Sequence, residues 1–124
     1  MILCDTNILI EFYKGNSEIV QELKEIGFSN LTISNITAGE LYFGARDKRE
    51  LGQIKRNLGL LNQIPINADI SERFLELLEE FALSHRLSVP DALIAATAIS
   101  QKIPLYTLNL KDFRFISNLQ LHES

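Results

Sequence analysis

Four acidic residues stand beside apolar segments rather than on an evidently polar surface. Asp5 directly follows the apolar run 1–4, Glu40 interrupts an apolar stretch, and Asp91 opens an alanine-rich segment. Asp112 comes shortly after a further apolar run. Carboxylates that share a site repel one another, which raises their pKa values and destabilises the fold. Such clusters therefore occur mainly where the carboxylates bind a cation or transfer a proton. Because carboxylate oxygens suit Mg²⁺ and Mn²⁺, the pattern predicts a divalent-cation site.

Each of these acids also has an ordinary structural alternative. Asp5 suits an Asx turn or a helix cap, and Asp112 suits a turn. Glu40 suits a salt bridge with Arg46, and Asp91 suits the positive end of a helix dipole. All of these alternatives must hold at once if the acids form no cluster.

Polar side chains accompany the first and the last of the acids. Thr6 and Asn7 follow the first, while Thr107 and Asn109 stand shortly before the last. Hydroxyl and amide groups can orient carboxylates or a water molecule by hydrogen bonding. We therefore include Thr107 and Asn109 as supporting groups of the predicted site.

The elements that must position these residues alternate between strands and helices. Continuous apolar runs predict strands at 1–4, 31–34 and 104–107, and weaker ones at 64–66 and 119–121. Helical spacing and capping residues predict helices at 6–13, 17–26, 35–46, 46–63, 71–86 and 90–99. This alternation predicts an α/β domain with a central, mainly parallel sheet. Such sheets bind ligands beyond the carboxyl ends of their strands, which is where Asp5 and Asp112 are expected.

The composition predicts one domain spanning residues 1–124. Hydrophobic residues make up 46% and charged residues 23%, which excludes a disordered or low-complexity chain. No apolar run approaches the about 20 residues of a membrane span, and we expect no secretory signal. The single cysteine, Cys4, excludes an internal disulfide framework and favours a cytoplasmic location.

The net charge of −4 would ordinarily count against a nucleic-acid binder. Four clustered carboxylates would account for that whole charge, and divalent ions would neutralise it. A local excess of basic residues in 46–56 is a candidate surface for the phosphates of a nucleic acid, with a solvated helix face as the alternative. Its members are Arg46, Lys48, Arg49, Lys55 and Arg56.

Taken together, the motifs resemble the PIN-domain nucleases, and most closely the VapC-type toxins of VapBC toxin–antitoxin pairs. In chain order they are Asp5-Thr6-Asn7, Ser34-Asn35-Ile36-Thr37 before Glu40-Leu41, Pro90-Asp91 before the alanine-rich helix, and the run from Leu105 to Phe113. The resemblance covers nearly the whole chain in order and spacing. It implies a three-layer α/β/α sandwich around a mainly parallel sheet.

The resemblance also implies a Mg²⁺- or Mn²⁺-dependent endoribonuclease acting on tRNA or rRNA. Asp5, Glu40 and Asp91 match the three firmest acids of the family. Many PIN domains carry the fourth acid where this chain has Asn109, and many toxins carry it where this chain has Asp112. We assign Asp112, with Asn109 as a supporting group.

The implied mechanism is metal-assisted phosphodiester hydrolysis by one ion or two. Asp5 and Asp91 would anchor an ion that activates water, and Glu40 would be a further ligand or a base. A second ion near Asp112 would stabilise the leaving oxygen. Thr6 matches the family motif and is expected, with Asn7, to organise the turn rather than to bind metal.

Two protein partners follow from the resemblance: a second copy of the chain, and a cognate VapB-type antitoxin whose C-terminal segment blocks the active-site groove. An aromatic cluster could supply the contact surface, although core packing is the simpler expectation for large apolar side chains. Its members are Phe12, Tyr13, Tyr42 and Phe43. Two other functions remain open, namely a PIN-like nuclease of RNA processing or DNA repair and a binding module without turnover.

Overall fold

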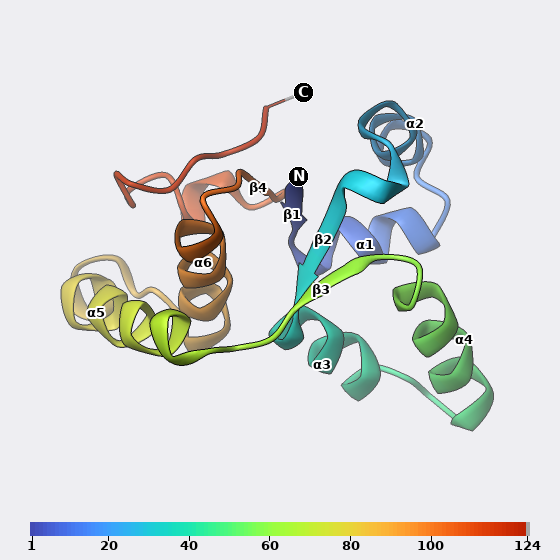
Figure 1. Ribbon diagram of the computed structural model, residues 1–124, viewed down its shortest axis with the longest axis horizontal. Helices are drawn as coiled ribbons and strands as arrows, with labels where there is room; N and C mark the ends of the chain where they lie inside the picture. Colours follow the sequence, from blue (N-terminus) through green and yellow to red (C-terminus); the bar gives the residue numbers. More distant parts are fainter. Residues whose placement is uncertain (124) are drawn as a thin grey trace.

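A four-stranded sheet lies between helices in the computed structural model, which describes residues 1–123 (Figure 1). The elements in chain order are β1 (Ile2–Cys4), α1 (Thr6–Tyr13), α2 (Ser17–Ile26), η1 (Phe28–Asn30), β2 (Leu31–Ser34), α3 (Asn35–Phe43), α4 (Lys48–Leu58), β3 (Asn62–Ile64), α5 (Ala68–His85), α6 (Val89–Gln101), β4 (Leu105–Tyr106) and η2 (Leu110–Asp112). The two η elements are single turns of 3₁₀ helix.

All strand pairs of the sheet are parallel, in the order β3-β2-β1-β4. β1 is central and pairs Leu3 with Leu105 of β4. Because the strands run the same way, their carboxyl ends meet at one edge. Asp5 follows β1 and Thr107 follows β4 at that edge. The predicted parallel sheet is thereby confirmed, and it places the two residues side by side.

Separate apolar clusters cover the two faces of the sheet. On one face α5 and α6 enclose Leu3, Ile94 and Phe113, all nearly inaccessible to solvent. On the other face, α1 and α2 contribute the buried side chains Ile8 and Leu23. In Figure 1 the two groups of helices flank the strands on opposite sides. This three-layer α/β/α arrangement is the one that the resemblance predicts.

α6 carries Asp91 into the edge of the core. Ala95 and Ala96 are fully buried in this helix, because small side chains allow it to lie close to its neighbours. Ser88 caps its start by accepting a hydrogen bond from the Asp91 N–H at 3.2 Å. Pro90 lies in the first turn, where an N–H is not needed. No helix within residues 1–123, α6 included, is long and apolar enough to cross a membrane.

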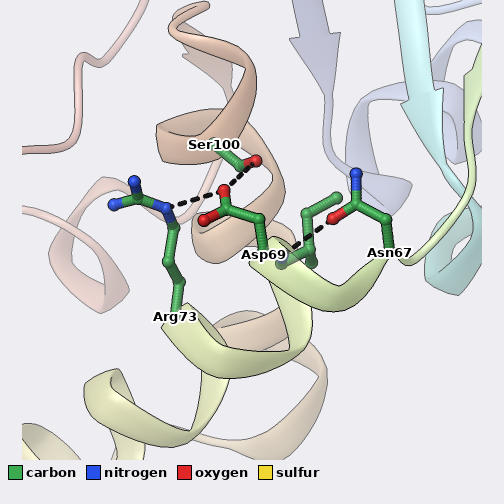
Figure 2. Close-up of polar contacts among 5 residues, drawn as sticks. Asn67, Asp69, Arg73 and Ser100 are labelled. Carbon is green, nitrogen blue, oxygen red and sulfur yellow. Dashed lines mark hydrogen bonds and ion pairs between the residues drawn. The ribbon is translucent and has the colours of Figure 1, made fainter.

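A polar network fastens the start of α5 to the end of α6 (Figure 2). Asp69 accepts hydrogen bonds from the Ser100 hydroxyl at 2.5 Å and from Arg73 Nε at 3.0 Å. Next to it, Asn67 caps α5 by accepting a hydrogen bond from the backbone N–H of Ile70 at 2.9 Å. The charge of this carboxylate is therefore balanced within its own helix.

The predicted boundaries around β3 were wrong by a few residues. The strand lies at 62–64 rather than 64–66, and the helix before it ends at Leu58 rather than near residue 63. Pro65 has no N–H to donate to a sheet ladder, which explains why pairing stops before it. The helix expected at 35–46 ends at Phe43, since Asp47 caps a new helix by accepting a backbone hydrogen bond.

Three further boundaries differ from prediction. α5 begins at Ala68 rather than residue 71, because Asn67 provides the cap. The strand expected at 104–107 is limited to Leu105–Tyr106. The weak strand expected at 119–121 is reduced to one isolated bridge between Leu121 and Leu105.

Candidate active site

The structure brings the four predicted acids together at the carboxyl edge of the sheet. Asp5 follows β1, Glu40 lies on α3, and Asp91 lies in the first turn of α6. Asp112 ends η2. Burial raises the pKa of Asp91 to about 6, with further contributions from the charges of Asp5, Asp112 and Glu40. The four carboxylates are therefore close enough to act on one another electrostatically, although they come from distant parts of the chain.

Asp5 is the most enclosed of the acids, with 5% of its surface exposed. One of its oxygens accepts a hydrogen bond from the Thr6 N–H at 2.7 Å, and the other accepts one from the Thr107 hydroxyl at 2.7 Å. Burial raises the pKa of Asp5. The two hydrogen bonds oppose that shift, while the charges of Glu40 and Asp112 reinforce it. Asp5 is thus a firmly oriented carboxylate that ionises reluctantly.

Glu40 is oriented by a hydroxyl from a different helix. The Thr6 side chain donates a hydrogen bond to Glu40 Oε1 at 2.7 Å. The hydroxyls of Thr6 and the fully buried Thr37 are hydrogen-bonded at 3.1 Å. Thr6 therefore contacts both Asp5, which follows β1, and Glu40, which lies on α3. Its role in the site is thus larger than the turn-organising role predicted for it. Thr37 belongs to one of the sequence motifs but was not predicted to be part of the site.

The remaining predicted supporting residues also lie at this edge. Asn7 accepts a hydrogen bond from the Leu108 N–H at 3.2 Å, and its amide approaches Thr107 at 3.4 Å. Asn109 donates its backbone N–H to the Thr107 hydroxyl oxygen at 3.1 Å. Asn109 thereby supports Asp5 indirectly, through Thr107, while its own side chain is exposed.

The donor chemistry of the four acids fits a hard divalent cation. Within residues 1–123, no lysine, arginine or histidine forms a salt bridge with any of them. A cation is thus the partner that would offset the repulsion described above. No three acidic, histidine or cysteine side chains of residues 1–123 are placed to hold one ion directly. Mg²⁺ commonly keeps several waters and uses one or two carboxylates, so the set fits a hydrated ion.

A groove of about 770 Å³ opens beside Glu40, with walls from α1, α3 and α4. Lys14, Arg46 and Arg56 line it, and Arg46 is paired with Glu50 at 3.0 Å. The other members of the predicted basic surface are exposed but lie outside the lining: Lys48, Arg49 and Lys55. Lys14 was not predicted as part of this surface, because it lies far from the basic residues of 46–56 along the chain.

Core packing was the wrong expectation for most of the aromatic cluster. Phe43 is 93% exposed, and Tyr13 and Tyr42 are 38% and 36% exposed. Phe12 is half-buried, with its ring 5.5 Å from that of Tyr13. Tyr13 lines the groove, as does Gly44, the residue after Phe43. Among the four aromatic residues, Tyr13 is therefore the one that borders the groove.

Comparisons with known proteins agree with this architecture. Residues 2–117 match the PIN domain family. Among curated proteins, the chain is similar to ribonuclease VapC10 of Mycobacterium tuberculosis, with 31% identity covering 97% of this chain and 91% of that protein. It is also similar to ribonuclease VapC of Rickettsia bellii, with 27% identity covering 97% and 93%.

Solved structures show the same likeness. A toxin–antitoxin complex from Klebsiella pneumoniae contains a chain 37% identical to this one, with a TM-score of 0.81 and coverage of 96% of this chain and 95% of that one. VapBC2 from Rickettsia felis, bound to a DNA fragment from its promoter, has a chain 26% identical, with a TM-score of 0.84 and 98% coverage of both chains.

Proposed function

This chain belongs to the PIN-domain family and to its VapC branch, and from that premise we propose that it is a Mg²⁺- or Mn²⁺-dependent endoribonuclease, the toxin of a type II toxin–antitoxin pair. The observation that carries the proposal is the meeting of Asp5, Glu40, Asp91 and Asp112 without a basic partner. Such a set of acids suits phosphodiester hydrolysis assisted by a divalent ion.

The chain's own residues orient the reacting groups. Asp5 and Asp91 would hold the ion, with Asp112 completing the acidic set. When bound, Mg²⁺ or Mn²⁺ supplies charge to offset the scissile phosphate and to promote ionisation of water. Thr107 fixes one oxygen of Asp5, as its 2.7 Å hydrogen bond indicates. Glu40, oriented by its own hydrogen bond, would be a further ligand or accept a proton from the attacking water.

The basic groove is suited to the RNA backbone. Its lining includes the basic side chains of Lys14, Arg46 and Arg56 against the acidic ones of Glu40 and Glu50, which leaves a small positive excess. Glu40 belongs both to the groove and to the acidic site. A strand whose phosphates contact these basic side chains would therefore lead toward the carboxylates. Phosphate contacts of this kind position a nucleic acid without reading its sequence. On this proposal, a chain of net negative charge would bind RNA through one local surface.

The proposed protein partners are a VapB-type antitoxin and a second copy of the chain. The relatives from Klebsiella pneumoniae and Rickettsia felis are described as a toxin–antitoxin complex and as VapBC2. The partly exposed ring of Tyr13 is suited to contact an apolar segment of a partner at the groove, and the 93% exposed ring of Phe43 offers a further apolar contact on α3. An antitoxin seated there would block access to Glu40. Both partners would meet this chain in the cytoplasm.

The decisive experiment is to induce the chain and sequence the 5′ ends of cellular RNA, followed by incubation of the purified, partner-free protein with tRNA and rRNA. Cleavage is expected with Mg²⁺ or Mn²⁺ and should disappear with EDTA or with Asp91→Asn. Asp69→Asn, an equal change of charge outside the site, is the matched control. Binding without cleavage would identify a binding module instead, and preferential cutting of precursor RNA or DNA flaps would identify a processing or repair nuclease.

A further inference from the structure

A buried threonine, Thr37, contacts the acidic site through a second hydroxyl rather than directly. It is the third residue of α3, and its side chain is fully buried. Its hydroxyl lies 3.1 Å from that of Thr6, which in turn lies 2.7 Å from Glu40 Oε1. A buried hydroxyl costs free energy unless it is hydrogen-bonded, and a valine would fill nearly the same space without that cost. Packing alone therefore does not explain a hydroxyl at position 37.

The direction of these two hydrogen bonds follows from the number of hydrogens. A hydroxyl carries one hydrogen, and an ionised carboxylate can only accept. The Thr6 hydrogen is therefore used for Glu40, and the bond between the threonines uses the Thr37 hydrogen, with the Thr6 oxygen accepting. The result is a hydroxyl relay from Thr37 through Thr6 to Glu40. A hydroxyl that accepts one hydrogen bond donates the next one more strongly.

A buried threonine on another helix uses its hydroxyl differently. The Thr97 hydroxyl donates to the Leu93 carbonyl at 2.7 Å, one turn earlier on α6. Helical threonines commonly make this bond within their own helix. Thr37 instead bonds across to α1, while its backbone N–H donates to the capping Ser34 hydroxyl at 3.3 Å. Thr37 is thus anchored at the end of β2 and directs its hydrogen out of its own helix.

We propose that Thr37 is a positioning residue, which donates to the Thr6 hydroxyl, keeps it directed at Glu40 and thereby orients Glu40 in the active site. The consequence for catalysis rests on the proposed function, whereas the orientation of Glu40 is a property of the metal-free chain. The bond from Thr6 engages Oε1, so the other carboxylate oxygen remains available to an ion or a water molecule. Thr37 itself acts only through Thr6.

The direct test is the side-chain conformation of Glu40 in the metal-free full chain, measured by NMR three-bond couplings with EDTA present. We expect one rotamer in the wild type and averaging among rotamers in Thr37→Val, which removes the hydroxyl and nearly keeps the shape. Thr32→Val is the matched control, because Thr32 on β2 is equally buried and its hydroxyl has no partner within residues 1–123. This control should leave Glu40 unchanged.

Cleavage of a fluorescent RNA at saturating Mn²⁺ measures the consequence for the reaction. Thr37→Val should lower kcat about 3- to 10-fold, the effect of one neutral hydrogen bond, and leave KM unchanged. Thr37→Ser keeps the hydroxyl but loses a buried methyl group, so it should lower the melting temperature and retain kcat. A threonine that only packs would not lose stability in one variant and rate in the other.

A double variant tests the route through Thr6. Thr6→Val breaks both bonds of the relay and keeps the backbone N–H that donates to Asp5. Adding Thr37→Val to it should cost no further rate, because the relay is already broken. An undiminished further loss would show that Thr37 acts in another way and would overturn the proposal.

The outcomes separate this inference from the proposed function. A single Glu40 rotamer in Thr37→Val, averaging already in the wild type, or equal rates in Thr37→Val and Thr32→Val would each overturn the role of Thr37 and leave the nuclease function standing. If the wild type cleaves no RNA, the proposed function fails, and the Glu40 couplings still decide whether Thr37 orients Glu40.

Discussion

Asp69 and Asp91 occupy the same kind of position, the first turn of a helix, and their carboxylates behave in opposite ways. The hydrogen bond from Ser100 lowers the pKa of Asp69, and Arg73 lowers it further (Figure 2). Burial raises the pKa of Asp91 to about 6, with the charge of Asp5 as the next contribution. One acid has its partners within the chain, whereas the other is grouped with further acids.

This contrast separates acids that stabilise the fold from acids that remain available to bind a cation or transfer a proton. Asp69 connects two helices through groups that the chain itself supplies, so its charge is satisfied in the folded protein. Around Asp91 and its neighbours the fold supplies hydroxyls and backbone N–H groups, and no basic side chain within residues 1–123 forms a salt bridge with these acids. Perturbed acids of this kind concentrate at functional sites. The two aspartates should therefore respond oppositely to the same substitution.

The largest expected effect is on RNA cleavage. Asp91→Asn should lower the initial rate by on the order of 10²–10³, because removing a group that stabilises the transition state typically costs that much. Asp69→Asn should leave the rate unchanged. Both rates are measured on a fluorescent RNA at saturating Mn²⁺. Comparable losses in both variants would mean that the contrast does not separate function from structure.

Divalent ions provide the second test. Mn²⁺ at about 100 times its Kd should raise the free energy of unfolding by about 2.7 kcal/mol, because it binds only the folded state. Asp69→Asn should keep this gain, and Asp91→Asn should lose most of it. Urea titrations with and without Mn²⁺ measure the difference. An equal gain in both variants would place the ion away from the acidic cluster.

The third test is the pH dependence of stability without metal. The pKa of Asp91 in the folded protein, about 6, lies above its ordinary value of 3.8. The folded state therefore binds the proton more tightly, and stability falls as pH rises from about 4 through 6. Asp91→Asn should flatten this decline and raise stability near pH 7.5 by about 1–2 kcal/mol, a figure reduced for the partial exposure of the site. Urea unfolding across pH 4–8 measures it, and an unchanged decline in the variant would contradict the assignment.

The smallest expected effect belongs to Asp69. Its pKa is lowered in the folded protein, so its contribution to stability is present above its ordinary value of 3.8 and is lost as pH falls through the lowered value. Asp69→Asn should lower the melting temperature slightly at pH 7, and the difference should shrink on acidification. Thermal melts at several pH values measure it. A higher melting temperature in this variant would show that the network in Figure 2 does not stabilise the helix pair.

Local patterns predicted most of the fold because they act within one element. The apolar run before Asp5 and the alanine-rich stretch after Asp91 specify a buried strand and a buried helix through their own side chains. β3 could not be placed in this way, because Asn62 and Gln63 give it no apolar signal. It is fixed instead by pairing with β2, aided by the Asn62 amide, which donates to the Leu31 carbonyl at 3.1 Å.

Surface features were the least predictable. Phe43 has the character of a core residue and is nevertheless 93% exposed, since α3 ends there without a neighbour to cover it. Lys14 joins the basic groove only because the end of α1 and the helix α4 both form walls of that groove in the folded chain. Hydrophobicity states a preference for burial, whereas actual burial depends on which elements pack together.

By itself, the amino-acid sequence determined the types of the candidate site residues, most of the strands and helices that carry them, and the edge of the sheet to which they belong. Only the tertiary structure decided which groups touch: Thr107 orients Asp5 from 102 residues away, and Thr6 joins Asp5 to Glu40. The physical reason is one of range. Backbone propensity and periodicity act over a turn or a strand, while hydrogen bonds and charge repulsion act between whatever side chains the packed layers bring together.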